Sequence, residues 1–280
     1  MTKLSCTMQS DNPFQRLEQM VGEAGLRRLR ESFVVVAGLG AVGGYAVEAL
    51  ARSGVGRFRL IDYDEVRPSN INRQLYALWE TVGRKKCELA AERVRAINPN
   101  CDVETLDLFV HTDTMPQVLA PWSDNSSSGN SLSSNSSACG KRPDFVIDAI
   151  DSLTPKLELV TVLQASGLPF ISSMGAALRT DPTLVRVGKL YEVTYCPLAA
   201  ILRKYLRRRD VSTDFDCVYS PEPVRHLRRD AVLPPEESEE NFYPKGRKRA
   251  SLGSLPTLTG IFGLTAANHV LLALLGRTDF

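Results

Sequence analysis

The chain has 280 residues, of which 43% are hydrophobic and 24% charged, a composition typical of a folded protein with a sizeable core. The formal net charge of only +2 excludes a chain-wide positive field as a reason to bind nucleic acid. None of the six cysteines belongs to a C-x-x-C pair, so the sequence does not predict a tetrathiolate zinc site.

Two stretches bear on where the protein works. The first residues, MTKLSCTMQSDNPF, have neither the apolar run of a secretory signal nor the arginines of a mitochondrial presequence. We therefore expect a protein of a reducing compartment, the cytoplasm, with a mitochondrial location as the alternative. The most apolar stretch, 258–275, is interrupted by Asn268, His269, threonines and glycines, so we expect a buried core helix and no membrane span.

Short apolar runs that end at glycine or aspartate alternate with segments of helical spacing. This alternation predicts an α/β fold with a doubly wound, mostly parallel, Rossmann-like sheet, followed by a C-terminal extension. Beyond Gly175 the pattern is less regular, with one strand-like piece over 184–187 before the apolar helix. The earlier predicted elements are a helix over 13–30, a strand over 33–37, a helix over 42–52, a strand over 57–61, a helix over 84–97, strands over 102–106 and 144–149, a helix over 153–166 and a strand over 170–173.

A single domain is predicted for residues 1–280. Within it we expect a nucleotide-binding core over 13–178 and a C-terminal part over 179–280 that faces the substrate. A Ser/Asn-rich tract over 123–140 has too few apolar residues to bury, and we interpret it as a disordered insertion in the core.

A glycine-rich loop follows the first predicted strand and opens a helix. Gly38, Gly40 and Gly43 have the G-x-G-x-x-G spacing, in which the glycines allow a tight turn, a close approach of phosphate or ribose, and close helix packing. The start of the helix adds amide donors and a partial positive charge. Asp62 ends the second predicted strand, where a carboxylate can accept hydrogen bonds from ribose hydroxyls. The loop thus predicts an adenine-nucleotide site.

Polar motifs downstream of Asp62 distinguish this site from that of a nicotinamide-dependent oxidoreductase. Together with the glycine loop, they resemble the adenylation domain of ubiquitin-activating and sulfur-carrier-activating enzymes, the ThiF/MoeB-like superfamily, over about half the chain. The motifs that carry the resemblance are, in order, GLGAVGG, LIDYDEV, SNINRQ, VGRKKCE, INP and DAIDS.

The resemblance implies ATP as cosubstrate, with cations to meet its triphosphate. Arg73 would fork onto phosphate oxygens, Lys86 would add a point charge, and Asn70 would donate its amide. Asp64, in the DYDEV phrase, is assigned to the same nucleotide site. Lys85 is the alternative to Lys86.

The same resemblance implies Mg²⁺, held by Asp151 at the carboxyl end of a strand, where it would clamp the phosphates and neutralise the leaving pyrophosphate. Asp148 is the alternative metal ligand. Arg16 lies where relatives contribute an arginine across a dimer interface, with a surface salt bridge as the equal alternative. The resemblance also implies a homodimer.

The second half of the chain carries phrases that resemble the tRNA threonylcarbamoyladenosine dehydratases within this superfamily: DPTLVRV, PLAAILR, DCVYS and GSLPTLTGIFG. That family adenylates the threonyl carboxylate of threonylcarbamoyladenosine beside the anticodon of tRNA. Ring closure by the neighbouring carbamoyl group then expels AMP. Because this step is intramolecular, it requires no covalent enzyme nucleophile.

The dehydratase resemblance gives a role to a basic cluster that would contact the tRNA backbone. Cys217 is assigned to the substrate side, either as a nucleophile, with His226 as the nearest candidate base, or as a buried free cysteine. The segment from Pro223 to Arg249 departs from the family pattern. The basic residues predicted to meet tRNA are Arg203, Lys204, Arg207, Arg208 and Arg209.

Three other functions stay as alternatives. A carrier-protein activator would share the adenylation chemistry, but the zinc cysteines usual in that group are absent from the sequence. A non-catalytic partner would tend to lose Arg73, Lys86 or Asp151. A nicotinamide oxidoreductase would not need cations and a metal carboxylate. The sequence leaves open whether a sulfur-relay or redox protein acts as a partner.

Overall fold

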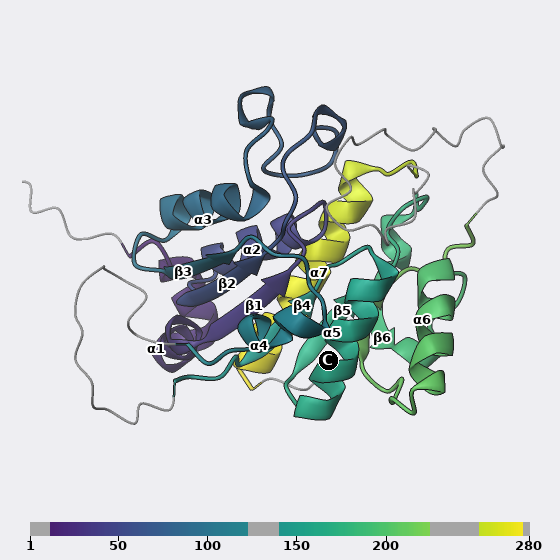
Figure 1. Cartoon of the computed structure of the whole chain (residues 1–280). Coiled ribbons are helices and arrows are strands. Elements are labelled where there is room, and N and C mark those ends of the chain that lie inside the picture. The colour runs from purple at the N-terminus through teal and green to yellow at the C-terminus, as the bar shows by residue number, and fades with distance from the viewer. Residues whose placement is uncertain (1–11, 123–139, 225–251, 277–280) are drawn as a thin grey trace, which may run out of the picture.

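The computed structural model describes residues 12–122, 140–224 and 252–276 (Figure 1). The predicted insertion over 123–140 lies outside these ranges except for its last residue. His226 and the basic residues of the segment up to Arg249 also lie outside them.

A seven-stranded sheet forms the centre of the molecule, with the strand order β3-β2-β1-β4-β5-β7-β6 (Figure 1). All neighbours pair in parallel except β6, which runs antiparallel to β7 at one edge. The predicted doubly wound, mostly parallel α/β fold is therefore confirmed. The strands are β1 (Phe33–Ala37), β2 (Arg57–Ile61), β3 (Asp102–Leu106), β4 (Phe145–Asp148), β5 (Phe170–Ser173), β6 (Arg186–Lys189) and β7 (Asp216–Tyr219).

Helices cover both faces of the sheet. One face packs on α1, α2, α3 and α7 through a core that includes Val34, Val36 and Phe262. The opposite face packs on α4, α5 and α6 through residues that include Val35 and Leu159. The helices are α1 (Gln15–Glu31), α2 (Gly43–Arg52), α3 (Lys86–Ile97), α4 (Met115–Val118), α5 (Leu153–Ser166), α6 (Pro197–Arg208) and α7 (Pro256–Leu274).

Both faces of the central strands are buried, which explains why their sequences are continuous apolar runs. Every residue of Phe33–Ala37 is inaccessible to solvent, with alternate side chains in the two cores. The edge strand β3 has the alternating polar sequence of a half-covered strand and is only partly buried.

The helix α7 forms where the apolar stretch predicted it. Among the described residues it is the one helix whose length and composition would let it cross a membrane, and 44% of its apolar window is buried inside the molecule. It contacts α2 and the strands β4 and β5. Gly263 makes this contact close, because a Cβ there would stand 2.2 Å from the carbonyl oxygen of Val42.

Two elements of the C-terminal part were not predicted. The PLAAILR phrase begins the amphipathic helix α6, which buries Ala199, Leu202 and Leu206 on one side. The DCVYS phrase forms β7, which inserts between β5 and β6. The strand predicted over 184–187 lies two residues farther on, as β6.

Candidate nucleotide-binding site

The candidate site lies at the carboxyl edge of the sheet, at the point where the strand order reverses. The strand β1 pairs with β2 on one side and with β4 on the other. The loops that follow these three strands carry the glycine motif, Asp62 and Asp151. In open α/β sheets this switch point is where ligands bind.

The glycine loop is held tightly against its neighbours. Gly38 adopts φ of +90°, and a Cβ there would lie 2.8 Å from the carbonyl oxygen of Ala149. At Gly43 a Cβ would lie only 1.8 Å from the carbonyl oxygen of Gly38. Gly40 is more open, with the side-chain amide of Gln74 at 3.6 Å from its Cβ position. Two glycines are therefore required by packing, and the middle one leaves room for a ligand.

The Asp62 carboxylate braces the same loop. Its Oδ2 accepts a hydrogen bond from the amide of Leu39 at 2.7 Å, and its Oδ1 accepts one from the amide of Asp64 at 2.9 Å. Burial raises the pKa of Asp62, against the opposing effect of the Lys86 charge and the two amide donors. The side chain lies at the end of β2, where sequence analysis expected it, and also orders the glycine loop.

The two candidate lysines differ in their surroundings. Lys86 is buried at the start of α3, and its Nζ lies 2.8 Å from Oδ2 of Asp64. Lys85 is partly exposed and pairs with Glu65 and Asp107, both at 3.3 Å. Lys86 and Asp64, which were predicted separately, thus form one ion pair next to Asp62.

The SNINRQ segment lies beside the glycine loop. The Asn70 side chain is buried and accepts a hydrogen bond from the Arg67 amide at 3.1 Å. Nη1 of Arg73 donates to the carbonyl oxygen of Ser69 and to Oδ1 of Asn72, both at 2.8 Å. The structure therefore brings this segment next to the glycine loop, with the Arg73 side chain bound to its own loop.

The aspartates that end β4 and follow it, Asp148 and Asp151, differ in burial. Asp148 is fully buried, and its Oδ2 lies 2.6 Å from Nζ of Lys156 and 2.6 Å from the hydroxyl of Ser172. Its Oδ1 accepts from the amide of Ile150 at 3.1 Å. Asp148 therefore has no exposed surface to offer to a metal ion. Asp151 is exposed, and the hydroxyl of Ser152 lies 3.4 Å from its Oδ1.

The carboxylates at this edge of the sheet fit a Mg²⁺ ion that is bound mainly through nucleotide phosphates. Within the described ranges there is no group of three or more His, Cys, Asp or Glu side chains that could hold a metal ion alone. Mg²⁺ typically uses one or two carboxylates and completes its shell with water and phosphate oxygens. One exposed carboxylate at the switch point meets that requirement.

The basic residues predicted to meet tRNA lie on α6 and just after it. Arg203 donates to the carbonyl oxygens of Leu190 and Val193 at 2.9 and 2.7 Å, so its guanidinium also holds the chain before α6. Arg209 pairs with Glu158 at 2.8 Å. The other three cations of this group are exposed: Lys204, Arg207 and Arg208.

Cys217 lies inside the sheet. Its side chain is fully buried on β7, and burial raises the pKa of the thiol far above its usual range. A thiol in this state is protonated at neutral pH and is a poor nucleophile. Its Sγ has only a long contact, 3.8 Å, with the carbonyl oxygen of Phe215.

Two residues next to the site were not singled out from the sequence. Gln74 follows Arg73 and lies beside Gly40. Lys156 is the one cation in a helical segment rich in leucine and valine, and it lies eight residues after Asp148. An isolated cation in such a segment was the available signal, because a buried charge requires a partner.

The chain matches the model of the ThiF family over residues 14–280 and belongs to that family. It is similar to the tRNA threonylcarbamoyladenosine dehydratase of Bacillus subtilis, with 34% identity and 94% of both chains covered. It is similar to the Escherichia coli dehydratase at 32% identity, with 92% of both chains covered.

The solved structures agree with the sequence comparison. The crystal structure of the Escherichia coli dehydratase in complex with AMP matches with a TM-score of 0.76 and 31% identity, over 95% of this chain and 94% of that chain. Its complex with ATP matches with a TM-score of 0.74. A SAMP-activating enzyme E1 from Haloferax volcanii is 32% identical but is covered over only 57% of its length.

Proposed function

We propose that this protein is an adenylate-forming enzyme that dehydrates threonylcarbamoyladenosine in tRNA at the expense of ATP. The observation that carries the proposal is the match to two bacterial dehydratases over more than nine-tenths of each chain. The arrangement of the glycine loop, the Lys86–Asp64 pair and Asp151 at one sheet edge supports it.

In the proposed reaction a carboxylate oxygen of the threonyl group attacks the α-phosphorus of ATP, and the bond to pyrophosphate breaks. The neighbouring carbamoyl group then attacks the acyl-adenylate carbonyl, the ring closes and AMP leaves. The oxygen lost from the substrate departs with AMP, and the carbamoyl group releases a proton as the ring closes, so the nucleoside, counted as the free acid, loses one water overall. Because both reacting groups belong to one nucleoside, the second step benefits from a high effective concentration.

The residues of this chain would bind and orient ATP. The glycine loop and the start of α2 would receive phosphate or ribose, and Asp62 would bind ribose hydroxyls. Arg73 would turn from its loop contacts toward the triphosphate, and Lys86 and Asn70 would contact it as well. Gln74, beside Gly40, is placed to donate to the same ligand.

We propose Asp151 as the protein ligand of Mg²⁺. Bound there with the nucleotide, the ion would neutralise charge on the departing pyrophosphate. The exposure of Asp151 and the saturation of Asp148 by Lys156, Ser172 and the Ile150 amide support this choice over the alternative.

We propose that α6 binds the tRNA backbone. Its exposed cations, Lys204, Arg207 and Arg208, would contact phosphates. Arg203 and Arg209 lie close by, but their guanidinium groups already contact the Leu190 carbonyl oxygen and the Glu158 carboxylate.

We also propose a cytoplasmic homodimer in which Arg16, exposed on α1, reaches the neighbouring subunit. No comparison supports the mitochondrial alternative or a sulfur-relay or redox partner.

The test is ATP consumption with and without tRNA that carries threonylcarbamoyladenosine, followed by mass spectrometry of the recovered nucleoside. We expect AMP only with that tRNA and a nucleoside lighter by one water. If the tRNA is inert and ATP–pyrophosphate exchange instead requires a protein with a C-terminal glycine, the chain activates a ubiquitin-like or sulfur-carrier protein.

A further inference from the structure

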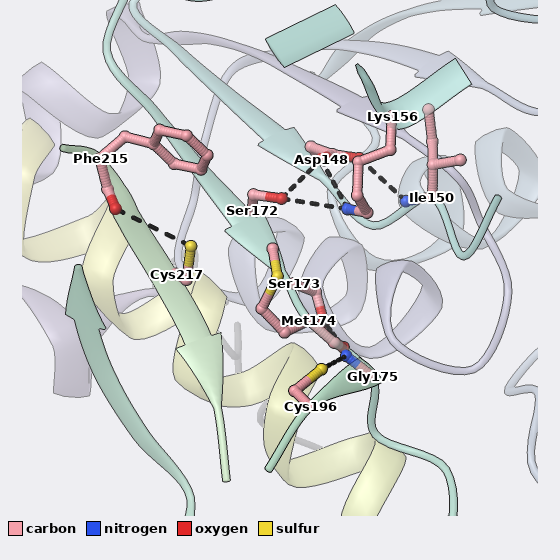
Figure 2. A network of polar contacts seen from close by, with 10 residues as sticks. All are labelled: Asp148, Ile150, Lys156, Ser172, Ser173, Met174, Gly175, Cys196, Phe215 and Cys217. Carbon is pink, nitrogen blue, oxygen red and sulfur yellow. Dashed lines mark hydrogen bonds and ion pairs between the residues drawn. The ribbon is translucent and has the colours of Figure 1, made fainter. Parts of the chain in front are cut away.

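Asp148, Lys156 and Ser172 form a buried polar network (Figure 2). The candidate metal ligand, Asp151, follows Asp148 by three residues. The side chains of Asp148 and Lys156 are both fully buried, with 2.6 Å between Oδ2 and Nζ. The hydroxyl of Ser172, on the adjacent strand β5, lies 2.6 Å from the same carboxylate oxygen and 3.0 Å from the ammonium. These contacts form a closed triangle of three polar side chains.

The network ties together both ends of the segment 149–152, which carries Asp151. At its first end, Oδ1 of Asp148 accepts the amide of Ile150 at 3.1 Å. At its second end, the amide of Lys156 donates to the carbonyl oxygen of Ser152 at 3.1 Å as α5 begins. The Lys156 side chain then returns to Asp148, so the strand, the loop and the helix are joined through one carboxylate.

The same segment lies against the glycine loop. The amide of Ala149 donates to the carbonyl oxygen of Ala37 at 2.8 Å, and the Ala149 carbonyl oxygen lies within 2.8 Å of the Cβ position at Gly38. A displacement of the segment would therefore change both the position of Asp151 and the shape of the phosphate-binding loop.

Stability alone does not account for a buried ion pair. Desolvation of two charges offsets much of their attraction, and well-packed apolar residues often replace such pairs without loss of stability. We propose that Asp148, Lys156 and Ser172 are positioning residues that hold Asp151 for the Mg²⁺ of Mg·ATP, an inference that rests on the proposed ATP function. They act through the loop and do not touch the nucleotide.

The test compares the ATP affinity of the full-length protein with and without Mg²⁺, measured by isothermal titration calorimetry without tRNA. Lys156→Met removes the charge, Lys156→Arg conserves it, and Asp148→Asn combined with Lys156→Met removes the pair without leaving an unpaired charge. For the wild-type protein, Mg²⁺ should strengthen ATP binding. In Lys156→Met and the double variant this Mg²⁺-dependent gain should shrink by about tenfold, the usual effect of losing a group that orients a metal ligand.

Two features of the design separate positioning from a general loss of stability. Lys156→Arg should recover most of the Mg²⁺-dependent gain. Arg59→Met provides the matched control, because Arg59 is 2% exposed and pairs with Glu104 on the neighbouring strand β3, away from the site. It should lower the melting temperature and leave the Mg²⁺-dependent gain unchanged.

The outcomes distinguish this inference from the function on which it rests. If the wild-type protein does not bind ATP, the proposed function fails and the inference fails with it. If the wild-type protein shows the Mg²⁺-dependent gain and the folded double variant retains it in full, the positioning role alone is overturned. The double variant gives this answer even if Lys156→Met does not fold.

Discussion

Cys217 lies on β7 without exposed surface, and its pKa is raised by burial, so its thiol stays protonated at neutral pH. The proposed ring closure is intramolecular, for which effective concentrations reach about 10⁵ M or more. Cys217→Ala should therefore keep the rate of cyclisation within roughly threefold of wild type, since no covalent nucleophile is needed. Single-turnover conversion of modified tRNA, followed by mass spectrometry, measures this rate. A loss of two orders of magnitude at an unchanged melting temperature would instead make Cys217 a nucleophile.

Arg73 is half-buried and Asp151 is exposed, and neither belongs to the hydrophobic core. Arg73→Ala and Asp151→Ala should each abolish pyrophosphate release while the melting temperature stays within a few degrees of wild type, because surface substitutions rarely change stability much. Arg52→Ala is the matched control, since it removes an exposed arginine that pairs with Glu48 and ends α2, the helix that begins at the glycine loop. Normal pyrophosphate release by either site variant contradicts the assignment.

At the scale of elements, the start of α2 is fixed by close contact with the glycine loop. In Gly43→Ala the new Cβ would lie 1.8 Å from the carbonyl oxygen of Gly38, so the helix must move away from the loop. We expect a stability loss of about 1–3 kcal/mol and at least tenfold weaker ATP binding. Gly44→Ala is the control, because the nearest atom to its Cβ would be in the Tyr76 ring, at 3.3 Å, and no backbone atom would lie closer than 3.7 Å. Thermal unfolding with and without ATP compares the two variants, and equal behaviour would remove the special role of Gly43.

The success of the sequence predictions differs between elements for physical reasons. The bounds of β1, β2, β3, α5 and β5 were predicted without error, because each is an apolar or alternating run bounded by turn residues or, for α5, a helical run before Gly167. The strand β7 has only four residues, and its pairing with β5 and β6 comes from tertiary contacts that no local pattern records. The helix α6 was not predicted, although its apolar residues have helical spacing, because the PLAAILR phrase was interpreted only as a family motif.

For the candidate site, the sequence predicts which residues lie at one edge of the sheet but not which side chains pair there. Residues on the glycine loop and at strand ends could be assigned, because parallel strands bring their carboxyl ends to one edge. The pairing of Asp148 with Lys156 could not, because it depends on how α5 packs back over β4. Once that contact is known, the choice between Asp148 and Asp151 as an accessible carboxylate follows from burial.

At the scale of the whole molecule, binding to a polyanion would depend on charge confined to one surface, since the net charge is only +2. Replacing Lys204, Arg207 and Arg208 by alanine should weaken tRNA binding and lower the slope of log affinity against log salt by about 2. Filter binding across a salt series measures both effects. Arg209→Ala should change the slope less, because Glu158 already lies 2.8 Å from that guanidinium. An unchanged slope in the triple variant would place the tRNA elsewhere.

The position of α7 has a consequence for biosynthesis. This helix, at the far end of the described chain, packs on α2 and supplies Phe262, Ala266 and Val270 to the core beneath the first strands. As the chain emerges from the ribosome, the glycine loop and its helix are made early, but the apolar surface they share with α7 stays uncovered until about residue 270 has been released. A nascent chain at that stage exposes a surface that chaperones recognise, so the nucleotide-binding half can complete its core only after α7 has left the ribosome.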